Sequence, residues 1–377
     1  MEQLRRHNLH LVLRAIYSGA AESRAELAVV TGLTKPTVST LIGELLAEGF
    51  ISERGPGRSS ESGGKRPTLL RFEPRARQVI GVSVVGNRAL GVLSDLAGET
   101  SALHVRELAP GEDPLADDAA AVGDVVAGLL PQLDAPLLGI GVGLPGSGAS
   151  PRPAASLGRR FRVSVYLGNQ AELSALGQLA YADGVEQGGT LVNLIVDGGI
   201  EMGVCMAGGA VHYGSDLADL VAPAEGVARQ LRELLAWGAV RGRVEAVLDA
   251  ASAEPGRANV GSQVGDAEPA VPSYLRLRQA AGHGNVAATA LIDELARNLS
   301  VVLAWLVATV RPSQVSLGGR LSDLGESFLD RLKEHAGTQV PAEQLERVAL
   351  SLAYSEQLGA MGAVALVVQA ELELLES

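Results

Sequence analysis

Small polar and basic side chains gather over residues 34–40, where the sequence runs TKPTVST. Lys35, Thr37, Ser39 and Thr40 carry a positive charge and hydroxyl groups that can meet phosphates and base edges in a DNA groove. Bulky apolar side chains, which would block entry to the groove, are absent from these four positions. The chemistry that this segment predicts is therefore DNA recognition rather than catalysis.

A helix must hold these side chains. The apolar positions of the segment are Val38, Leu41, Ile42, Leu45 and Leu46, which fall on one helical face. Thr34 fits the N-cap of this helix, and Pro36 is tolerated in a first helical turn. The helix is expected to end near Ala47, and its polar face then includes Thr34, Pro36 and the four groups above.

A second, shorter helix is expected just before it. Ser23 and Glu26 have the spacing of a capping box, and Gly32 can adopt the positive φ that a tight turn between helices requires. Ala28 is small enough for close helix approach. The order of Ala28, Gly32, Val38 and Leu41 predicts a helix-turn-helix, with an ordinary helical hairpin as the alternative. Arg24, at the start of the first helix, joins the candidate DNA contacts.

A hairpin should follow the two helices. Residues 50–53 and 68–72 read as strands, and the polar, glycine-rich segment between them reads as a flexible tip. Lys65 and Arg66 in that tip could reach a minor groove, where basic side chains are favoured. A solvated loop is the alternative. Residues 1–76 are accordingly expected to form a winged helix-turn-helix domain.

Charge is distributed unevenly along the chain. The 377 residues have a net charge of −12, yet residues 1–78 hold twelve Lys and Arg against eight Asp and Glu, a net of +4. The remainder has a net charge of −16. A basic head on an acidic body favours a nucleic-acid partner for the head, and the acidic body would orient the protein on a duplex. Chance scatter of charges is the alternative.

The composition also bears on location. No apolar run reaches the roughly 18 residues that a membrane span needs, and the first ten residues do not resemble a secretory signal. Cys205, the single cysteine, has no partner for an intrachain disulfide. We therefore expect a cytoplasmic protein with no membrane partner.

These motifs give the sequence a resemblance to the ROK family of bacterial sugar-responsive repressors and sugar kinases. The resemblance includes SRAELA at 23–28, TGLTKPTVS at 31–39, GIGVGLPG at 139–146, NQAELSALG at 169–177, VSLGGRL at 315–321 and the segment 348–362. It implies an α/β body of two lobes, related to actin, hexokinase and the ribonuclease H-like fold. It also implies a DNA operator, a homodimer or homotetramer, and a small-molecule effector.

The order of the expected elements agrees with such a body. Strands are predicted over 79–85, 88–94, 101–108, 137–142, 191–196, 202–207 and 314–317, and helices over 115–130 and 286–310. Strands that alternate with helices indicate an α/β fold. The expected first lobe covers residues 77–180, and the second covers 181–377 with the oligomerisation helices. Residues 150–160 are expected to form a loop.

The catalytic motifs of the family are missing. Residues 83–88 lack the Asp and paired glycines with which the kinases hold nucleotide phosphates. Gln170 follows Asn169 at the position of the catalytic Asp of the kinases, and glutamine cannot act as a general base. Glu201 places a carboxylate where phosphates would approach. An enzyme is not expected, and an ATP-dependent sugar kinase is the remote alternative.

The sugar and zinc motifs are missing too. Residues 218–223 contain neither the Glu nor the His of the sugar-binding motif, and one cysteine cannot complete a tetrahedral zinc site. No metal or other cofactor is therefore expected. The candidates for a remnant effector pocket are Asn169, Gln170, Glu172, Glu201, His212 and Asp216, each of which could instead be a solvated loop residue. A transcriptional repressor with a degenerate effector domain follows, and regulation by a non-sugar small molecule or a protein partner is the alternative.

Overall fold

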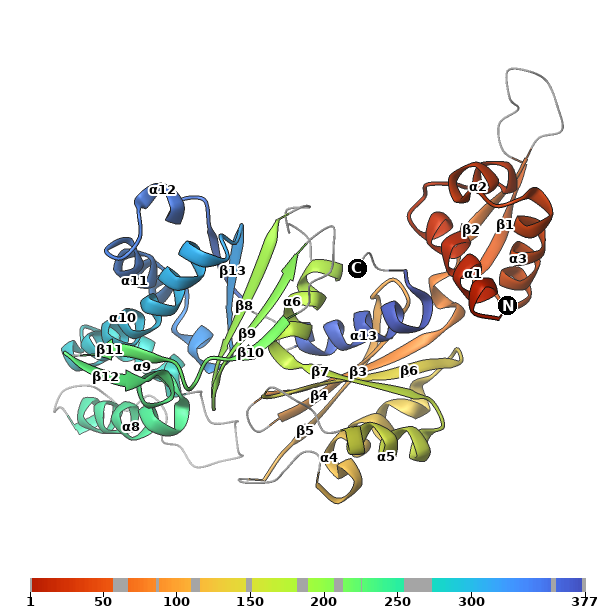
Figure 1. The fold of residues 1–377 in the computed structure, drawn as a ribbon. Coiled ribbons are helices and arrows are strands. Elements are labelled where there is room, and N and C mark those ends of the chain that lie inside the picture. Colours follow the sequence, from red (N-terminus) through yellow and green to blue (C-terminus); the bar gives the residue numbers. More distant parts are fainter. Residues whose placement is uncertain are drawn as a thin grey trace.

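The protein consists of a small N-terminal head and a body of two lobes (Figure 1). The computed structural model describes residues 2–56, 67–85, 88–109, 116–146, 151–181, 189–206, 213–224, 226–253, 273–353 and 357–374. The α/β body of two lobes and the winged helix-turn-helix head confirm the predicted fold class.

The head packs three helices against a two-stranded sheet. Its elements are α1 (Glu2–Tyr17), α2 (Arg24–Thr31), α3 (Lys35–Ala47), β1 (Ile51–Pro56) and β2 (Thr68–Phe72). The two strands are antiparallel. Leu13, Leu27, Val38 and Ile42 are at most 1% exposed and form the core that fixes the helices against one another. The helix and strand positions predicted for this region are confirmed to within three residues.

The first lobe is built on a five-stranded sheet with the order β5-β4-β3-β6-β7. The strands are β3 (Gln78–Val85), β4 (Arg88–Asp95), β5 (Thr100–Glu107), β6 (Leu137–Leu144) and β7 (Ser164–Asn169). Strands β3, β4 and β5 pair in antiparallel fashion, whereas β6 and β7 add in parallel to β3. Two helices, α4 (Ala116–Leu129) and α5 (Pro151–Phe161), lie on one face of this sheet (Figure 1).

Helix α5 corrects one expectation. Residues 150–160 were expected to form a loop, but Pro151–Phe161 is a helix. Proline is tolerated in a first helical turn, where its missing N–H would have no partner in any case. Leu157 is fully buried and anchors the helix in the core. The Arg160 guanidinium lies 5.0 Å from the centre of the Phe161 ring, which secures the last turn.

The second lobe repeats the design of the first. Its sheet has the order β10-β9-β8-β13-β14, again with three antiparallel strands followed by two parallel ones. The strands are β8 (Thr190–Val196), β9 (Ile200–Met206), β10 (Tyr213–Asp216), β13 (Gln314–Gly318) and β14 (Ala349–Leu352). A separate hairpin pairs β11 (Val221–Ala224) with β12 (Val227–Gln230).

Helices cover this lobe on the side away from the first lobe (Figure 1). They are α7 (Leu231–Leu235), α8 (Trp237–Ala253), α9 (Ser273–Gly282), α10 (Val286–Thr309), α11 (Glu326–Gly337) and α12 (Ala342–Leu345). Short 3-10 turns occupy Pro74–Ala76, Leu130–Gln132 and Arg320–Leu324. Helix α10 contributes the buried Leu295, Leu299 and Leu303 to the largest hydrophobic cluster of the body.

Two helices lie between the sheets of the two lobes. They are α6 (Gln170–Tyr181) and the C-terminal helix α13 (Gln357–Leu372), and they make the most extensive contact of any two elements. Glycines allow this approach: a Cβ on Gly362 would lie 1.6 Å from the carbonyl oxygen of Leu173. Helix α13 also packs on β3 and β6, and its end meets the head. The last helix of the chain therefore belongs by contact to the first lobe.

Candidate functional site

The turn between α2 and α3 has the geometry that the sequence predicts. Ser23 caps α2 and accepts a hydrogen bond from the Glu26 N–H at 3.4 Å, whereas the Glu26 carboxylate accepts from the Glu22 N–H at 2.9 Å. Gly32 ends α2 with φ 69°, a left-handed conformation that glycine adopts without strain. Thr34 caps α3 and accepts from the Thr37 N–H at 3.4 Å. The two helices are thus held by caps at both sides of the turn.

The start of α3 presents polar side chains outside the core. Thr34, Lys35, Ser39 and Thr40 are exposed, as is Pro36, and Thr37 is half-buried. The hydroxyls of Thr34 and Thr37 lie 2.8 Å apart, and the Thr40 hydroxyl donates to the Pro36 carbonyl at 3.1 Å. Among the described residues no ion pair holds Lys35. This surface offers one free cation and a row of hydroxyls, which suits phosphates and base edges.

The other candidate DNA contacts differ in their surroundings. The Arg24 guanidinium donates to the Glu53 carboxylate on β1 at 3.1 Å, so it would have to exchange this partner to meet a phosphate. Lys65 and Arg66, at the expected tip of the wing, lie outside the described residues. The predicted role of all three stays a prediction.

A buried carboxylate joins the two lobes. Glu201, on β9 of the second lobe, is 5% exposed and accepts three hydrogen bonds from the first lobe. Its donors are the Gly146 N–H at 3.0 Å, the Asn169 side-chain amide at 3.0 Å and the Gln170 side-chain amide at 3.2 Å. Asn169 also caps α6, because its carbonyl oxygen accepts from the N–H groups of Ala171 and Glu172. The structure thus brings together three of the predicted pocket residues, Asn169, Gln170 and Glu201. The side-chain amides of Asn169 and Gln170 both donate to the Glu201 carboxylate.

Burial is the main influence on the ionisation of Glu201. It raises the pKa of this carboxyl, while the hydrogen bonds from Gly146, Asn169 and Gln170 act in the opposite direction. Asp216, which faces Glu201 across the β9–β10 pair, raises the pKa further. Gln170 is 3% exposed and uses its amide as a donor toward Glu201, so this position contains no group that could take a proton from a hydroxyl.

The remaining pocket candidates lie at the edge of this cluster or beyond it. Asp216 is exposed and accepts from the Ala218 N–H at 2.8 Å. Glu172 is half-buried, and its burial raises the pKa of its carboxyl. Cys205 is buried in a small apolar cluster, and this burial raises the pKa of its thiol to about 12. His212 lies outside the described residues.

One feature of the body is not apparent from the sequence. Asp197, just after β8, is 8% exposed and accepts a hydrogen bond from Arg320 Nε at 2.6 Å. Arg320 follows β13 and lies over the Trp237 ring, 5.4 Å from its centre. The pair therefore sits at the carboxyl ends of two parallel strands, where open α/β sheets bind ligands. The two residues are 123 positions apart, and no spacing rule connects them.

The junction between the head and the body was also not predicted. His10 Nδ1 and Arg14 Nη2, on α1, lie 3.2 and 3.4 Å from the Glu373 carboxylate just beyond α13. Arg14 Nε donates to the Glu373 carbonyl at 2.8 Å. The neighbouring His10 ring is the main influence that lowers the pKa of Glu373. Glu371 accepts from the Tyr166 hydroxyl at 2.8 Å and lies 3.7 Å from Arg6.

Two kinds of site find no support in the part of the chain that the structure describes. No group of three or more His, Cys, Asp or Glu side chains lies close enough to hold a metal ion there. None of the described helices combines the length and the apolar character that a membrane crossing requires.

Comparisons with known proteins point in one direction. The model of the ROK family matches residues 258–370. The xylose repressor of Caldicellulosiruptor bescii is 27% identical over 362 residues, which are 88% of this chain and 87% of that protein. Among solved structures, a ROK family transcriptional regulator, a homolog of the E. coli MLC protein, aligns with a TM-score of 0.74 at 18% identity. It covers 99% of this chain and 98% of its own.

A kinase of the same fold aligns with less of the chain. The ROK family glucokinase of Streptomyces griseus, solved with glucose and AMPPNP, has a TM-score of 0.58 at 20% identity. The alignment covers 98% of that kinase but 77% of this chain. The kinase fold thus accounts for the body, and the regulator fold accounts for the body and the head together.

Proposed function

The chain belongs to the ROK family, and on that premise we propose that it is a DNA-binding transcriptional repressor whose body no longer phosphorylates sugars. The observation that carries the proposal is the polar surface at the start of α3, held by the Thr34 cap and the Gly32 turn. It presents Lys35 and three hydroxyls on the helix that enters the major groove in proteins with this motif, with the Thr34 hydroxyl at its cap. Lys65 and Arg66 would add minor-groove contacts from the wing.

The body supports the loss of catalysis. A sugar kinase requires a base beside the accepting hydroxyl and a phosphate site with no negative charge nearby. Gln170 fills the position of the base and donates to Glu201, and Asp197 adds a second carboxylate where the strands of the second lobe end. Because Arg320 offsets the charge of Asp197, it is chiefly the Glu201 carboxylate that would repel the phosphates of a nucleotide. We therefore infer that the cleft holds the lobes together rather than catalyses a reaction.

The effector of this repressor is proposed to differ from a plain hexose. Asn169 and Gln170, the polar groups best placed to bind a hydroxyl in the cleft, already donate to Glu201. A sugar would have to displace a carboxylate that accepts three hydrogen bonds. The carboxylate of an acidic ligand could accept the same three hydrogen bonds in place of Glu201, whereas a neutral sugar has no such anionic group.

Assembly and location follow from the same proposal. A two-fold homodimer, or a tetramer made of two such dimers, would place two α3 helices on the half-sites of a pseudo-palindromic operator. Such a repressor acts in the cytoplasm, because the chromosome lies there.

The test of the proposal is genome-wide mapping of the sites that the full-length protein occupies in its own host. The expected result is a small set of discrete sites with two-fold symmetry, each upstream of a transcribed gene. A diffuse distribution without a shared sequence would contradict the proposal, because phosphate contacts alone give non-specific binding.

The kinase alternative has its own measurement. A coupled assay with ATP, Mg²⁺ and a panel of hexoses and pentoses should show no turnover above the level of a Gln170→Ala control. A rate that exceeds this control and survives repurification would show that the protein is a sugar kinase.

A further inference from the structure

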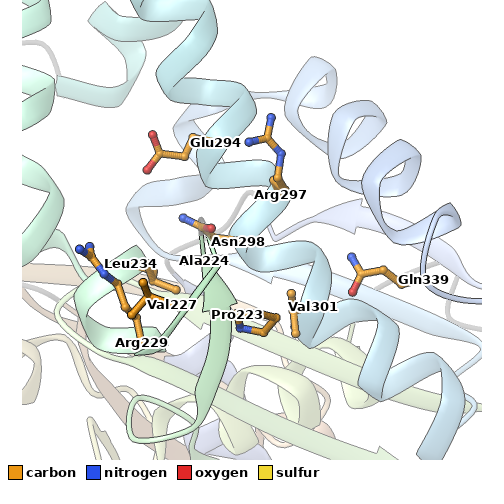
Figure 2. Close-up of a pocket in the computed structure, with 10 residues that line it drawn as sticks. All are labelled: Pro223, Ala224, Val227, Arg229, Leu234, Glu294, Arg297, Asn298, Val301 and Gln339. Atoms are coloured by element: carbon orange, nitrogen blue, oxygen red, sulfur yellow. The ribbon is translucent and has the colours of Figure 1, made fainter.

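A cavity of about 400 Å³ lies in the second lobe between the β11–β12 hairpin and helix α10. Figure 2 shows the side chains that surround it, all of which come from the second lobe. The cavity is therefore separate from the cluster around Glu201, which joins the two lobes. Its volume lies in the range of roughly 300–1,000 Å³ that is typical of small-molecule sites.

A buried amide without a partner lines this cavity. Asn298, in the middle of α10, is 7% exposed, and its side chain makes no hydrogen bond with any of the described residues. Figure 2 shows this side chain directed from α10 toward the hairpin. Polar groups nearby are paired: Gln339 donates to the Ser300 hydroxyl at 2.7 Å. The polar atoms of the Asn298 amide are reached from the cavity and make no hydrogen bond to another described side chain, so they can bind an occupant there.

The charges around the cavity favour an anion. Its one carboxylate, Glu294, is held by both terminal nitrogens of Arg243 at 2.8 and 2.5 Å. Arg297 is bound to Asp293 at 2.5 Å. Arg229 on β12 is exposed, and no ion pair engages it within the described segments. A free guanidinium binds carboxylate or phosphate oxygens through two parallel hydrogen bonds.

The rest of the lining is apolar. Leu234 is 5% exposed and forms part of the wall, and Val227 of the hairpin is 60% exposed beside it. A few convergent polar groups on an apolar lining are the usual composition of a site for a small metabolite.

We propose that this cavity binds a small metabolite with a carboxylate or phosphate group. Arg229 binds the oxyanion, Asn298 and the carbonyl oxygen of Gln339 bind hydroxyl or amide groups of the ligand, and Val227 and Leu234 cover its apolar part. The site belongs to the body alone, and its occupancy does not depend on whether the head binds DNA.

The test is calorimetric titration of the full-length protein, without DNA, with four probes. Inorganic phosphate and glucose 6-phosphate represent phosphates, gluconate represents carboxylates, and glucose is the uncharged control. The expected result is saturable binding of at least one charged probe and none of glucose. The phosphate and carboxylate arms then distinguish the two sources of the oxyanion.

Matched variants locate the binding. Arg229→Ala should weaken binding of the charged probe by about tenfold or more, because one hydrogen-bonded charge is lost. Asn298→Ala should weaken it as well. Arg347→Ala removes another exposed arginine, one outside the cavity, and should leave the affinity unchanged. Failure of all three charged probes to bind, or equal affinities of the Arg229→Ala and wild-type proteins, would overturn the proposal.

Discussion

Glu201 lies in a place that water hardly reaches, and the surrounding donors offset the loss of hydration in part. All three of its hydrogen bonds come from donors of the first lobe. These bonds supply the carboxylate oxygens with partners and also hold the two lobes together. A buried carboxylate is tolerated in proteins only with such partners. Glu201 therefore links the two lobes through the polar groups of the cleft.

Substitution of Glu201 should expose this role. In Glu201→Gln the new amide group must face either the Asn169 amide or the Gly146 N–H, and two donors then meet. Asn169 cannot turn over, because its carbonyl oxygen caps α6. The expected loss in the free energy of unfolding is about 1–3 kcal/mol, measured by urea denaturation. A variant as stable as the wild type would show that the lobes do not depend on this carboxylate.

The pH dependence has a defined sign. Burial raises the pKa of Glu201 in the folded protein, so its protonated form is favoured there relative to the unfolded chain. The resulting stabilisation is complete below the ordinary carboxyl pKa and is lost as the pH rises through the raised pKa. The stability advantage of the wild type over Glu201→Gln should therefore shrink across this window, as followed by calorimetric melting. An advantage that grows with pH would contradict the assignment.

At the scale of elements, the contact between α6 and α13 has the tightest geometry in the body. The two helices touch backbone to backbone at Gly177 and Gly362: a Cβ on Gly177 would lie 2.3 Å from the Leu358 carbonyl oxygen. Helix α6 begins at the Asn169–Glu201 cluster, and α13 ends at the head. The pair thus connects the cleft between the lobes with the DNA-binding domain.

A methyl group at this crossing should separate the helices. Gly362→Ala places a Cβ 1.6 Å from the Leu173 carbonyl oxygen, and the helices must move apart. The expected loss is about 3 kcal/mol or more, measured by denaturant unfolding. Gly242→Ala makes the same chemical change in α8, where a Cβ meets nothing within 4 Å. This control should gain up to about 1 kcal/mol from helix propensity, and equal effects of the two changes would contradict the close contact.

The sequence predicted most elements because each follows from local pattern. The capped helices of the head, the buried strands β3 and β6, and helix α10 have strong apolar periodicity or turn signals. Helix α5 was not predicted, although Leu157 lies at a core position. The bonds of Glu201 to Asn169 and Gln170 could not be derived, because no local rule brings residues 31 or 32 positions apart into contact.

In the whole molecule, the head is held on the body by a shared apolar cluster and by charges at the end of α13. Glu373 has φ 53°, a left-handed conformation that favours glycine or asparagine. Its carboxylate nevertheless lies near both His10 and Arg14. A glutamate in an unfavourable backbone conformation indicates that its side chain matters for docking of the head.

Replacement of Glu373 should free the head without unfolding the body. Glu373→Asn relieves the backbone strain and removes the carboxylate from His10 and Arg14. Hydrogen exchange should become faster in α1 and stay unchanged in β3. If exchange in α1 is unaffected, the charges at the end of α13 do not hold the head. Helix α13 would then not couple the cleft between the lobes to the head through these charges.

If the start of α3 binds DNA, the salt dependence of binding should reveal the phosphate contact of Lys35. Fluorescence anisotropy with a bound site should show that Lys35→Ala weakens binding and lowers the slope of log affinity against log salt by about 0.9, the value for one phosphate contact. Lys333→Ala, which removes an exposed lysine from α11, should change neither. A Lys35→Ala protein with the affinity and salt slope of the wild type would contradict the account.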